Sequence, residues 1–269
     1  MKKAEVISNF LLDHGVENVA WSSLQDENFI KRVNEKEFDM MIALGGDGTM
    51  LHAGSICAPL GIPVLGINLG RFGFLTEIRQ NQCDELLPLL VSGQYRLEER
   101  MLLRAKHIRG GKVLDSWHVI NEVVVCRGQI VRPIRIKAEV DGYLLTKYVA
   151  DGLIAATPTG STAYALAAGG PIMPPELRNI LIIPVAPHLS VDRAIILSEG
   201  SGIMMTVQTD HEAVMSIDGH PPIPMSSGDS VRVQSNDFNL HFVRFQDPGY
   251  FYRNITMYME QSPISGNRQ

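Results

Sequence analysis

The chain has 269 residues, of which 45% are hydrophobic and 20% charged, enough for one large or two ordinary folded domains with a sizeable core. Its net charge of −5 disfavours a nucleic-acid partner, because a phosphate backbone needs a basic protein face. Three widely spaced cysteines disfavour a disulfide framework or a zinc site, and neither a signal peptide nor an apolar run of membrane-spanning length is recognised. We therefore expect a soluble, cytoplasmic protein with no membrane partner.

The first third of the chain alternates between two hydrophobic patterns. Amphipathic periods predict helices over 4–14, 27–35, 49–57 and 83–91, and short apolar runs predict strands over 18–21, 38–44 and 63–68. Alternation at this spacing predicts an α/β domain with a doubly wound parallel sheet, which we place at residues 1–98. Ligands on such sheets bind at the carboxyl ends of the strands.

Beyond residue 95 strands follow one another with few helices between them. An all-β domain, sandwich-like in preference to barrel-like, is expected over 99–245, and a tail over 246–269 contains a predicted helix at 247–259. The strands are predicted at 102–108, 112–127, 130–140, 143–149, 153–156, 180–183, 193–198, 203–208, 213–217, 230–234 and 239–245.

A glycine turn follows the apolar run at 40–44. Gly45, Gly46 and Gly48 allow close approach to a ligand, and Thr49 opens the next predicted helix, whose N-terminus favours an anion such as phosphate. A carboxylate at Asp47 opposes a phosphate unless it binds a metal or accepts a proton. The alternative is a packing turn in which Asp47 is a local hydrogen-bond acceptor, because neither of the better-known phosphate-loop spacings is present.

Two further segments carry candidate binding residues. Residues 157–161 form a predicted turn rich in hydroxyls before a short helix at 162–168, where Tyr164 can stack on a planar ring; a merely capped and closely packed helix is the alternative. Asn121-Glu122 precedes an apolar strand and could hold ribose hydroxyls or an adenine edge, although the pair taken alone favours a solvated strand end.

Together these motifs resemble the NAD kinase family, with agreeing order and spacing from about residue 39 to the tail. The 157–164 segment is highly specific, whereas the glycine turn is shared with lipid kinases and phosphofructokinase-like enzymes. The resemblance implies an α/β and a β domain with a substrate cleft between them, a tail that crosses back to the first domain, and a homodimer or homotetramer. It is carried by residues 45–49, 66–70, 73–75, 121–122 and 151–171.

The resemblance also implies the chemistry. NAD kinases transfer the terminal phosphoryl group of ATP, or of polyphosphate, to the 2′-hydroxyl of the adenosine ribose of NAD, which gives NADP. Asp47 matches the family's proposed general base. A divalent metal, Mg²⁺ in our expectation, accompanies the nucleotide phosphates, and no protein residue is assigned as a metal ligand.

Individual contacts are carried over from the family in the same way. Asn121 and Glu122 would hold the adenosine part, Phe74 the adenine pocket, and Asp151 with Tyr164 the nicotinamide riboside. The full set implied for NAD is Asp47, Gly48, Phe74, Asn121, Glu122, Asp151, Thr159, Thr162, Ala163, Tyr164, Ala165, Leu166, Ala167, Ala186 and His220. The set implied for phosphate is Gly45, Gly46, Gly48, Thr49 and His52.

The chain departs from the family pattern at two places. A strand normally precedes the helix expected at 4–14, so a trimmed N-terminus and a sheet one strand short are expected here. Ala167 stands where many members have serine, which removes one polar contact to the dinucleotide.

Two other functions are alternatives to the NAD kinase hypothesis. A diacylglycerol- or sphingosine-type lipid kinase is disfavoured because the segment at 66–73 lacks the Gly-Thr-x-Asn-Asp motif of those enzymes. A non-catalytic dinucleotide sensor is disfavoured by Asp47, because binding alone gains nothing from a carboxylate that faces phosphate.

Overall fold

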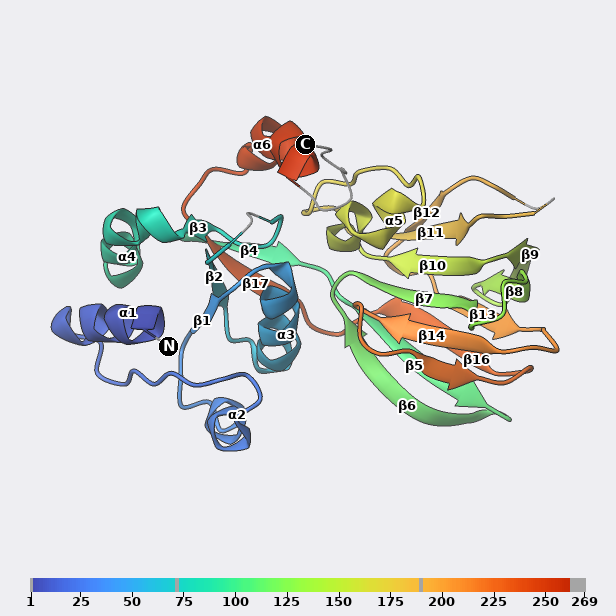
Figure 1. The fold of residues 1–269 in the computed structure, drawn as a ribbon, viewed down its shortest axis with the longest axis horizontal. Coiled ribbons are helices and arrows are strands. Elements are labelled where there is room, and N and C mark those ends of the chain that lie inside the picture. Colours follow the sequence, from blue (N-terminus) through green and yellow to red (C-terminus); the bar gives the residue numbers. More distant parts are fainter. Residues whose placement is uncertain (1, 71–72, 189–190, 262–269) are drawn as a thin grey trace. The chain divides into compact units, whose positions relative to one another are not determined.

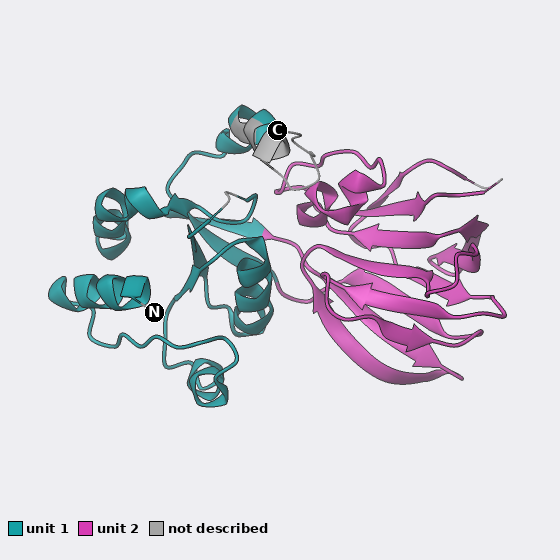
Figure 2. Ribbon diagram, in the orientation of Figure 1, with its two compact units in different colours: residues 1–99, 239–269 teal, residues 100–238 magenta. Residues whose placement is uncertain are grey.

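The computed structural model describes residues 2–70, 73–188 and 191–261, and the chain divides into two compact units. Unit 1 comprises Met1–Glu99 and Asn239–Gln269, and unit 2 comprises Arg100–Phe238 (Figure 2). Within the described residues, no helix is both long and apolar enough to cross a membrane.

Unit 1 is an α/β unit built on one sheet. The strands follow the order β1-β2-β17-β4, with β3 also paired to β2, and the pairings of β2 with β1, β17 and β3 are parallel. The strands are β1 (Met41–Leu44), β2 (Val64–Asn68), β3 (Ile78–Arg79), β4 (Arg96–Arg100) and β17 (Leu240–Arg244), and the helices are α1 (Lys2–Asp13), α2 (Glu27–Asn34), α3 (Asp47–Cys57), α4 (Cys83–Val91) and α6 (Tyr250–Gln261) (Figure 1).

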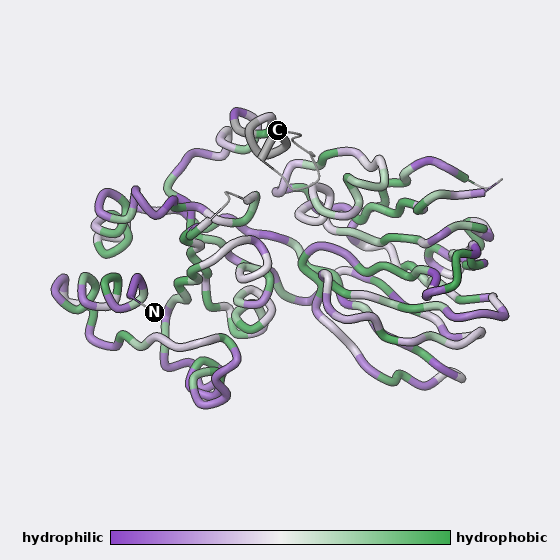
Figure 3. The backbone as a smooth tube through the Cα atoms, in the orientation of Figure 1, coloured by the Kyte–Doolittle hydropathy of each residue, from purple (hydrophilic) through white to green (hydrophobic). Residues whose placement is uncertain are grey.

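The hydrophobic pattern of the sequence explains the core of unit 1. All five residues of β2 are buried, as expected for a central parallel strand that is covered on both faces. Ile7 and Leu11 of α1 and Leu87 of α4 pack in the same cluster as Leu65 and Ile67 of β2. In Figure 3 the hydrophobic colour accordingly runs along β1 and β2. The predicted α/β domain is confirmed.

Unit 2 is a sandwich of two six-stranded antiparallel sheets. One sheet has the order β12-β11-β10-β7-β14-β15 and the other β6-β5-β16-β13-β8-β9. The strands of the two sheets are β5 (Leu103–Arg109), β6 (Lys112–Val119), β7 (Glu122–Arg127), β8 (Ile134–Val140), β9 (Tyr143–Ala150), β10 (Gly152–Ala156), β11 (Asn179–Val185), β12 (Ile195–Ser198), β13 (Ile203–Val207), β14 (Ala213–Ile217), β15 (Ile223–Met225) and β16 (Ser230–Ser235).

The two sheets of unit 2 share one core. Val125 and Leu153 from the first sheet pack in the same buried cluster as Ala105, Ile136 and Val231 from the second. This is the alternating inward face that the sequence predicts for a sandwich, and it confirms the all-β domain.

The outer face of the first sheet is covered as well. Ile154 of β10 and Leu181 of β11 pack with Ala165 of α5 (Tyr164–Ala167), so β10 is buried on both faces. The segment that follows β10 is therefore fixed to the sheet by apolar packing.

The structure corrects several details of the sequence-based prediction. The strand predicted at 18–21 is wrong, because these residues have no ladder partner and Trp21 is exposed. The strand predicted at 239–245 belongs to unit 1 rather than to the β domain, because β17 pairs with β2 (Figure 1). The helix predicted at 162–168 is shorter: a 3₁₀ turn over Thr159–Thr162 precedes α5. Residues 112–127 form two strands, and β3, β4 and β15 were not predicted.

Candidate functional site

The glycine turn delivers the chain directly from β1 to α3. Only Gly45 and Gly46 separate the two elements, and the Gly45 N–H donates to the carbonyl of Ile67 at 3.0 Å. A Cβ on Gly45 would lie 2.2 Å from Oγ1 of Thr49, so only glycine fits there. Gly46 is the N-cap of α3 and gives no side-chain cap, and a helix N-terminus of this kind favours an anion such as phosphate.

Asp47 is the first residue of α3, and its carboxylate is held by the loop that follows β2. Oδ2 accepts the Phe74 N–H and Oδ1 accepts the Leu75 N–H, each at 3.0 Å. A Cβ on Gly73 would lie 2.2 Å from Oδ1, so the loop approaches the carboxylate as closely as glycine allows. A carboxylate can accept up to about four hydrogen bonds, so two backbone donors do not prevent it from accepting a substrate hydroxyl.

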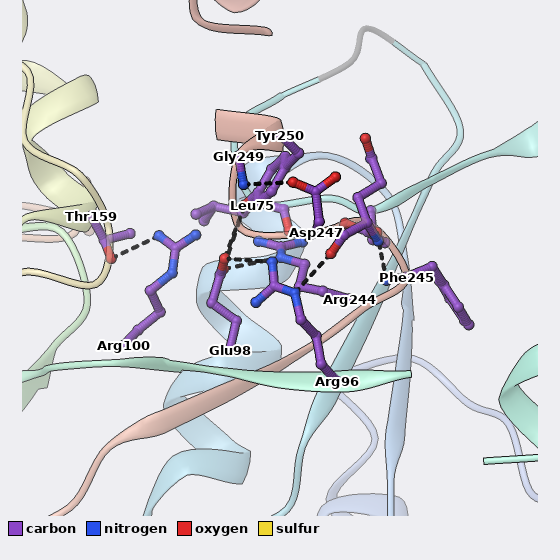
Figure 4. A network of polar contacts seen from close by, with 12 residues as sticks. Leu75, Arg96, Glu98, Arg100, Thr159, Arg244, Phe245, Asp247, Gly249 and Tyr250 are labelled. Carbon is purple, nitrogen blue, oxygen red and sulfur yellow. Dashed lines mark hydrogen bonds and ion pairs between the residues drawn. The ribbon is translucent and has the colours of Figure 1, made fainter. Parts of the chain in front are cut away.

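The same loop is anchored on its other side by a buried polar network that sequence reasoning missed. Nη1 of Arg244 donates to the carbonyl of Leu75 at 3.0 Å and to Oε2 of Glu77 at 3.3 Å, and its Nε donates to Oε1 of Glu98 at 3.0 Å (Figure 4). The available signal was a charged residue that directly continues the apolar run of β17.

Gly48, Thr49 and His52 of unit 1 line a cavity of about 1220 Å³. Its other walls include residues of α1, α2, β1 and α4 and residues 16–25 and 37–40. Three of the five predicted phosphate residues therefore line this cavity, whereas Gly45 and Gly46 are not among its lining residues.

In unit 2 the start of β7 is organised by Asp218, a second residue that sequence reasoning missed. Its carboxylate accepts the N–H groups of Ile120, Asn121 and Glu122 at 2.7–3.0 Å. The strand that the sequence predicts as continuous is interrupted at residues 120–121, and β7 begins at Glu122, which pairs with Ala156 of β10. Asp218 has φ +48° in an Asp218-Gly219 turn, which is the signal that could have found it.

Glu122 is a buried carboxyl with an incomplete set of partners. Burial and the neighbouring Asp218 raise its pKa to about 8, although a hydrogen bond from the Tyr164 N–H opposes this. Among the described residues, its Oε2 has no hydrogen-bond partner. Such a carboxyl is suited to a ligand hydroxyl that completes the set.

Most hydroxyls of the 157–161 turn serve the turn itself. The Thr157 hydroxyl donates to the carbonyl of Ile120 at 2.6 Å, and the Ser161 hydroxyl donates to Pro158 and accepts from Met173. Oγ1 of Thr159, a residue only 5% exposed, accepts from Arg100 at 3.1 Å. The packing explanation therefore holds for these three side chains.

Tyr164, by contrast, is 44% exposed and can present its ring to a ligand. Burial and the nearby Cys126 and Asp151 raise the pKa of its hydroxyl. Asp151 precedes β10, and its Oδ2 lies 3.3 Å from Nε of Arg127. Glu122, Asp151 and Tyr164, which are far apart in the sequence, therefore lie in one region of unit 2.

The other predicted contacts surround this region in different ways. The Asp151 N–H donates to the carbonyl of Val185 at 2.9 Å, which places Ala186 beside Asp151, and Ala186 has φ +45°. His220 is exposed directly after the Asp218-Gly219 turn, whereas Ala165 is fully buried in the core.

The predicted residues are thus divided between the two units. Unit 1 carries Gly45, Gly46, Asp47, Gly48, Thr49, His52 and Phe74, and unit 2 carries Asn121, Glu122, Asp151, Thr159, Thr162, Ala163, Tyr164, Ala165, Leu166, Ala167, Ala186 and His220. Over the part of the chain that the structure describes, no three His, Cys, Asp or Glu side chains gather as a metal-binding group.

Comparison with known proteins agrees with both units. Residues 4–95 match the family model of the ATP-NAD kinase N-terminal domain, and residues 120–245 match that of the ATP-NAD kinase C-terminal domain. The chain belongs to the NAD kinase family. The predicted family is therefore confirmed, the protein is an enzyme of the kinase class, and the lipid-kinase alternative is set aside.

Several NAD kinases are similar to this family member in sequence. The enzyme of Heliobacterium modesticaldum is 42% identical over 217 residues, which are 80% of this chain and 77% of that protein. That of Caldanaerobacter subterraneus is 35% identical over 252 residues, which are 91% of this chain and 89% of that protein.

Solved structures show the same likeness. Yeast NADH kinase complexed with NADH has a TM-score of 0.76 and 29% identity, over 86% of this chain and 67% of that one. An NAD kinase from Archaeoglobus fulgidus in complex with ATP has a TM-score of 0.75 and 25% identity, over 97% of this chain and 96% of that one.

Proposed function

We propose that this enzyme transfers the terminal phosphoryl group of ATP to the 2′-hydroxyl of the adenosine ribose of NAD, which gives NADP and ADP. The observation that carries the proposal is Asp47, a carboxylate held by two N–H groups at the N-terminus of the helix that follows the glycine turn. The relatives that bind ATP and NADH support the two substrates.

Each part of the turn has a separate task in this reaction. The N–H groups at the start of α3 hold the phosphates of the donor. As the 2′-oxygen attacks phosphorus, a new O–P bond forms, the bond to the leaving ADP breaks, and the hydroxyl proton passes to Asp47. The N–H groups of Phe74 and Leu75 hold the carboxylate in place for that transfer.

The residues of unit 2 are proposed to bind the acceptor. Asn121 and Glu122 hold the adenosine part, and the buried Oε2 of Glu122 gains a partner from a ribose hydroxyl. The exposed ring of Tyr164 stacks on the nicotinamide side, with Asp151 beside it.

A divalent metal is part of the proposal, with Mg²⁺ as our choice. The phosphate oxygens of the donor suit the preference of a hard cation for oxygen ligands, and no residue of the turn is assigned as a metal ligand. When bound, the metal would neutralise charge that develops on the phosphates.

Polyphosphate as an alternative donor and a homodimer or homotetramer are proposed on the family resemblance alone, and a cytoplasmic location is proposed on the composition of the chain. Light scattering of the purified protein tests the oligomer. Parallel assays with ATP and with polyphosphate test the donor.

Asp47→Asn tests the role of the carboxylate. The amide is similar in shape but cannot take up the proton, so we expect turnover to fall by about 10²–10⁴-fold while the Kd for NAD stays near that of the wild type. Asp84→Asn, the same exchange at an exposed position in α4, is the matched control. Near-normal turnover of Asp47→Asn would remove Asp47 from the mechanism.

A further inference from the structure

Arg244 connects strand β17 to the loop that holds Asp47. It is the last residue of β17, its side chain is completely buried, and it lies 169 positions after Leu75 in the sequence. Leu75 is bonded in both directions: its carbonyl accepts Nη1 of Arg244, and its N–H donates to Oδ1 of Asp47, each at 3.0 Å. Figure 4 shows the guanidinium between Leu75 and Glu98.

Glu77 closes a second connection between the same two segments. Its Oε1 accepts the Phe245 N–H at 2.8 Å, its Oε2 accepts from Arg244, and its own N–H donates to the carbonyl of Gly66 at 3.0 Å. The segment from Leu75 to Glu77 is therefore tied both to β2 and to the end of β17. These contacts leave it little freedom to move relative to Asp47.

Stability alone does not explain this arrangement. A buried ion pair is often no more stabilising than apolar side chains of similar volume, because desolvation of the charges is costly. Among the described residues, Nη2 of Arg244 has no hydrogen-bond partner, which adds to that cost. The guanidinium can instead fix the orientation of its partners, because its planar group of N–H donors binds a carbonyl and two carboxylates at the same time.

We infer that Arg244 is a positioning residue for the kinase reaction: it fixes the Leu75 segment and, through the Leu75 N–H, the carboxylate of Asp47. The effect on turnover rests on the proposed function, whereas the effect on the loop does not. The polar contacts of Arg244 are with Leu75, Glu77 and Glu98, and no contact with a substrate is assigned to it.

The test uses Arg244→Lys in the full-length enzyme, with two readouts. Lysine keeps the positive charge but cannot reproduce the planar group of donors, so we expect kcat to fall about 10- to 100-fold, with the KM for NAD within about twofold of wild type. Amide hydrogen exchange supplies the second readout, and the Phe74 and Leu75 N–H groups should exchange at least about tenfold faster in the folded variant.

Tyr250→Phe is the matched control, because it removes the hydroxyl that donates to Glu98 at 3.2 Å and leaves the contacts of Arg244 with Leu75 and Glu77 in place. It should change neither readout. If Arg244→Lys does not fold, Glu77→Gln, which turns a charged acceptor of Arg244 into an amide, is judged by the same two readouts.

A folded Arg244→Lys or Glu77→Gln enzyme with wild-type kcat and wild-type exchange at Phe74 and Leu75 would overturn the inference. A kcat loss without faster exchange at these two amides would also overturn it. If the wild type forms no NADP, the proposed function fails instead, and the exchange readout still decides whether Arg244 fixes the loop.

Discussion

The two units treat their key carboxyl groups in opposite ways. Both oxygens of Asp47 in unit 1 accept backbone N–H groups, from Phe74 and Leu75. Glu122 in unit 2 is buried beside a second carboxyl, Asp218, and its pKa is raised to about 8, chiefly by burial. One carboxyl is thus fixed by donors, and the other is left short of them.

This difference matches the two tasks proposed for the units. A proton acceptor must be held accurately where the reacting hydroxyl arrives, and the loop at 73–77 does this for Asp47. A recognition group gains most when the ligand supplies its missing partner, as a ribose hydroxyl would do for Glu122. Disturbing unit 1 should therefore lower kcat, and disturbing unit 2 should weaken NAD binding.

Gly73→Ala should have the largest effect among the tests of this contrast. The new Cβ would lie 2.2 Å from Oδ1 of Asp47, so the loop or the carboxylate must shift. We expect kcat to fall about 10- to 100-fold, with little change in the KM for NAD, in steady-state assays. Gly70→Ala in the same loop is the control, because nothing lies within 4 Å of its Cβ position. Equal kcat values for the two variants would show that the close approach at Gly73 does not matter.

Tyr164→Ala should act on binding rather than on the chemical step. Loss of a ring that stacks on the nicotinamide side costs about 1–3 kcal/mol, so we expect the Kd for NAD to rise at least about fivefold by calorimetry, and the Kd for ATP to stay unchanged. Tyr143→Ala, at an exposed hairpin position of the same unit, is the control. Equal losses of NAD and ATP affinity in Tyr164→Ala would contradict the assignment.

Glu122→Gln should have the smallest effect, on the pH dependence of stability. The ordinary pKa of 4.5 is raised to about 8 in the folded state, so between these values the folded protein binds more protons than the unfolded one. The free energy of unfolding therefore falls as pH rises through that window.

Glutamine does not titrate, so the fall in Tm between pH 5 and 8.5 should be smaller in Glu122→Gln than in the wild type. It should not vanish, because burial also raises the pKa of Asp218. Superimposable Tm–pH curves for the two proteins would mean that Glu122 holds no proton in the folded state at neutral pH.

Local sequence patterns predicted much of this molecule. The apolar run before Gly45 and the helix after it predicted the turn around Asp47, and alternation of apolar residues predicted most strands of the sandwich. Asp47 was singled out because a carboxylate in a phosphate turn conflicts with elementary electrostatics. Features of this kind depend on neighbours in the sequence.

Long-range contacts were beyond such reasoning. Arg244 bonds to Leu75 across 169 positions, and Asp218 bonds to Asn121 across 97. The pairing of β17 with β2 moved a predicted strand of the β domain into unit 1, because an apolar strand does not encode which sheet it joins. The hydroxyls of Thr157 and Ser161 looked available for a ligand but were committed to backbone groups of their own and neighbouring turns.

The central claim is tested most directly by incubating the purified wild-type protein with NAD, ATP and Mg²⁺ and measuring NADP with an NADP-specific dehydrogenase. A parallel reaction replaces ATP with polyphosphate, and a third omits NAD. We expect NADP to form in the ATP reaction and to require NAD. Absence of NADP with either donor would contradict the proposed phosphoryl transfer and would favour a protein that binds dinucleotides without phosphorylating them.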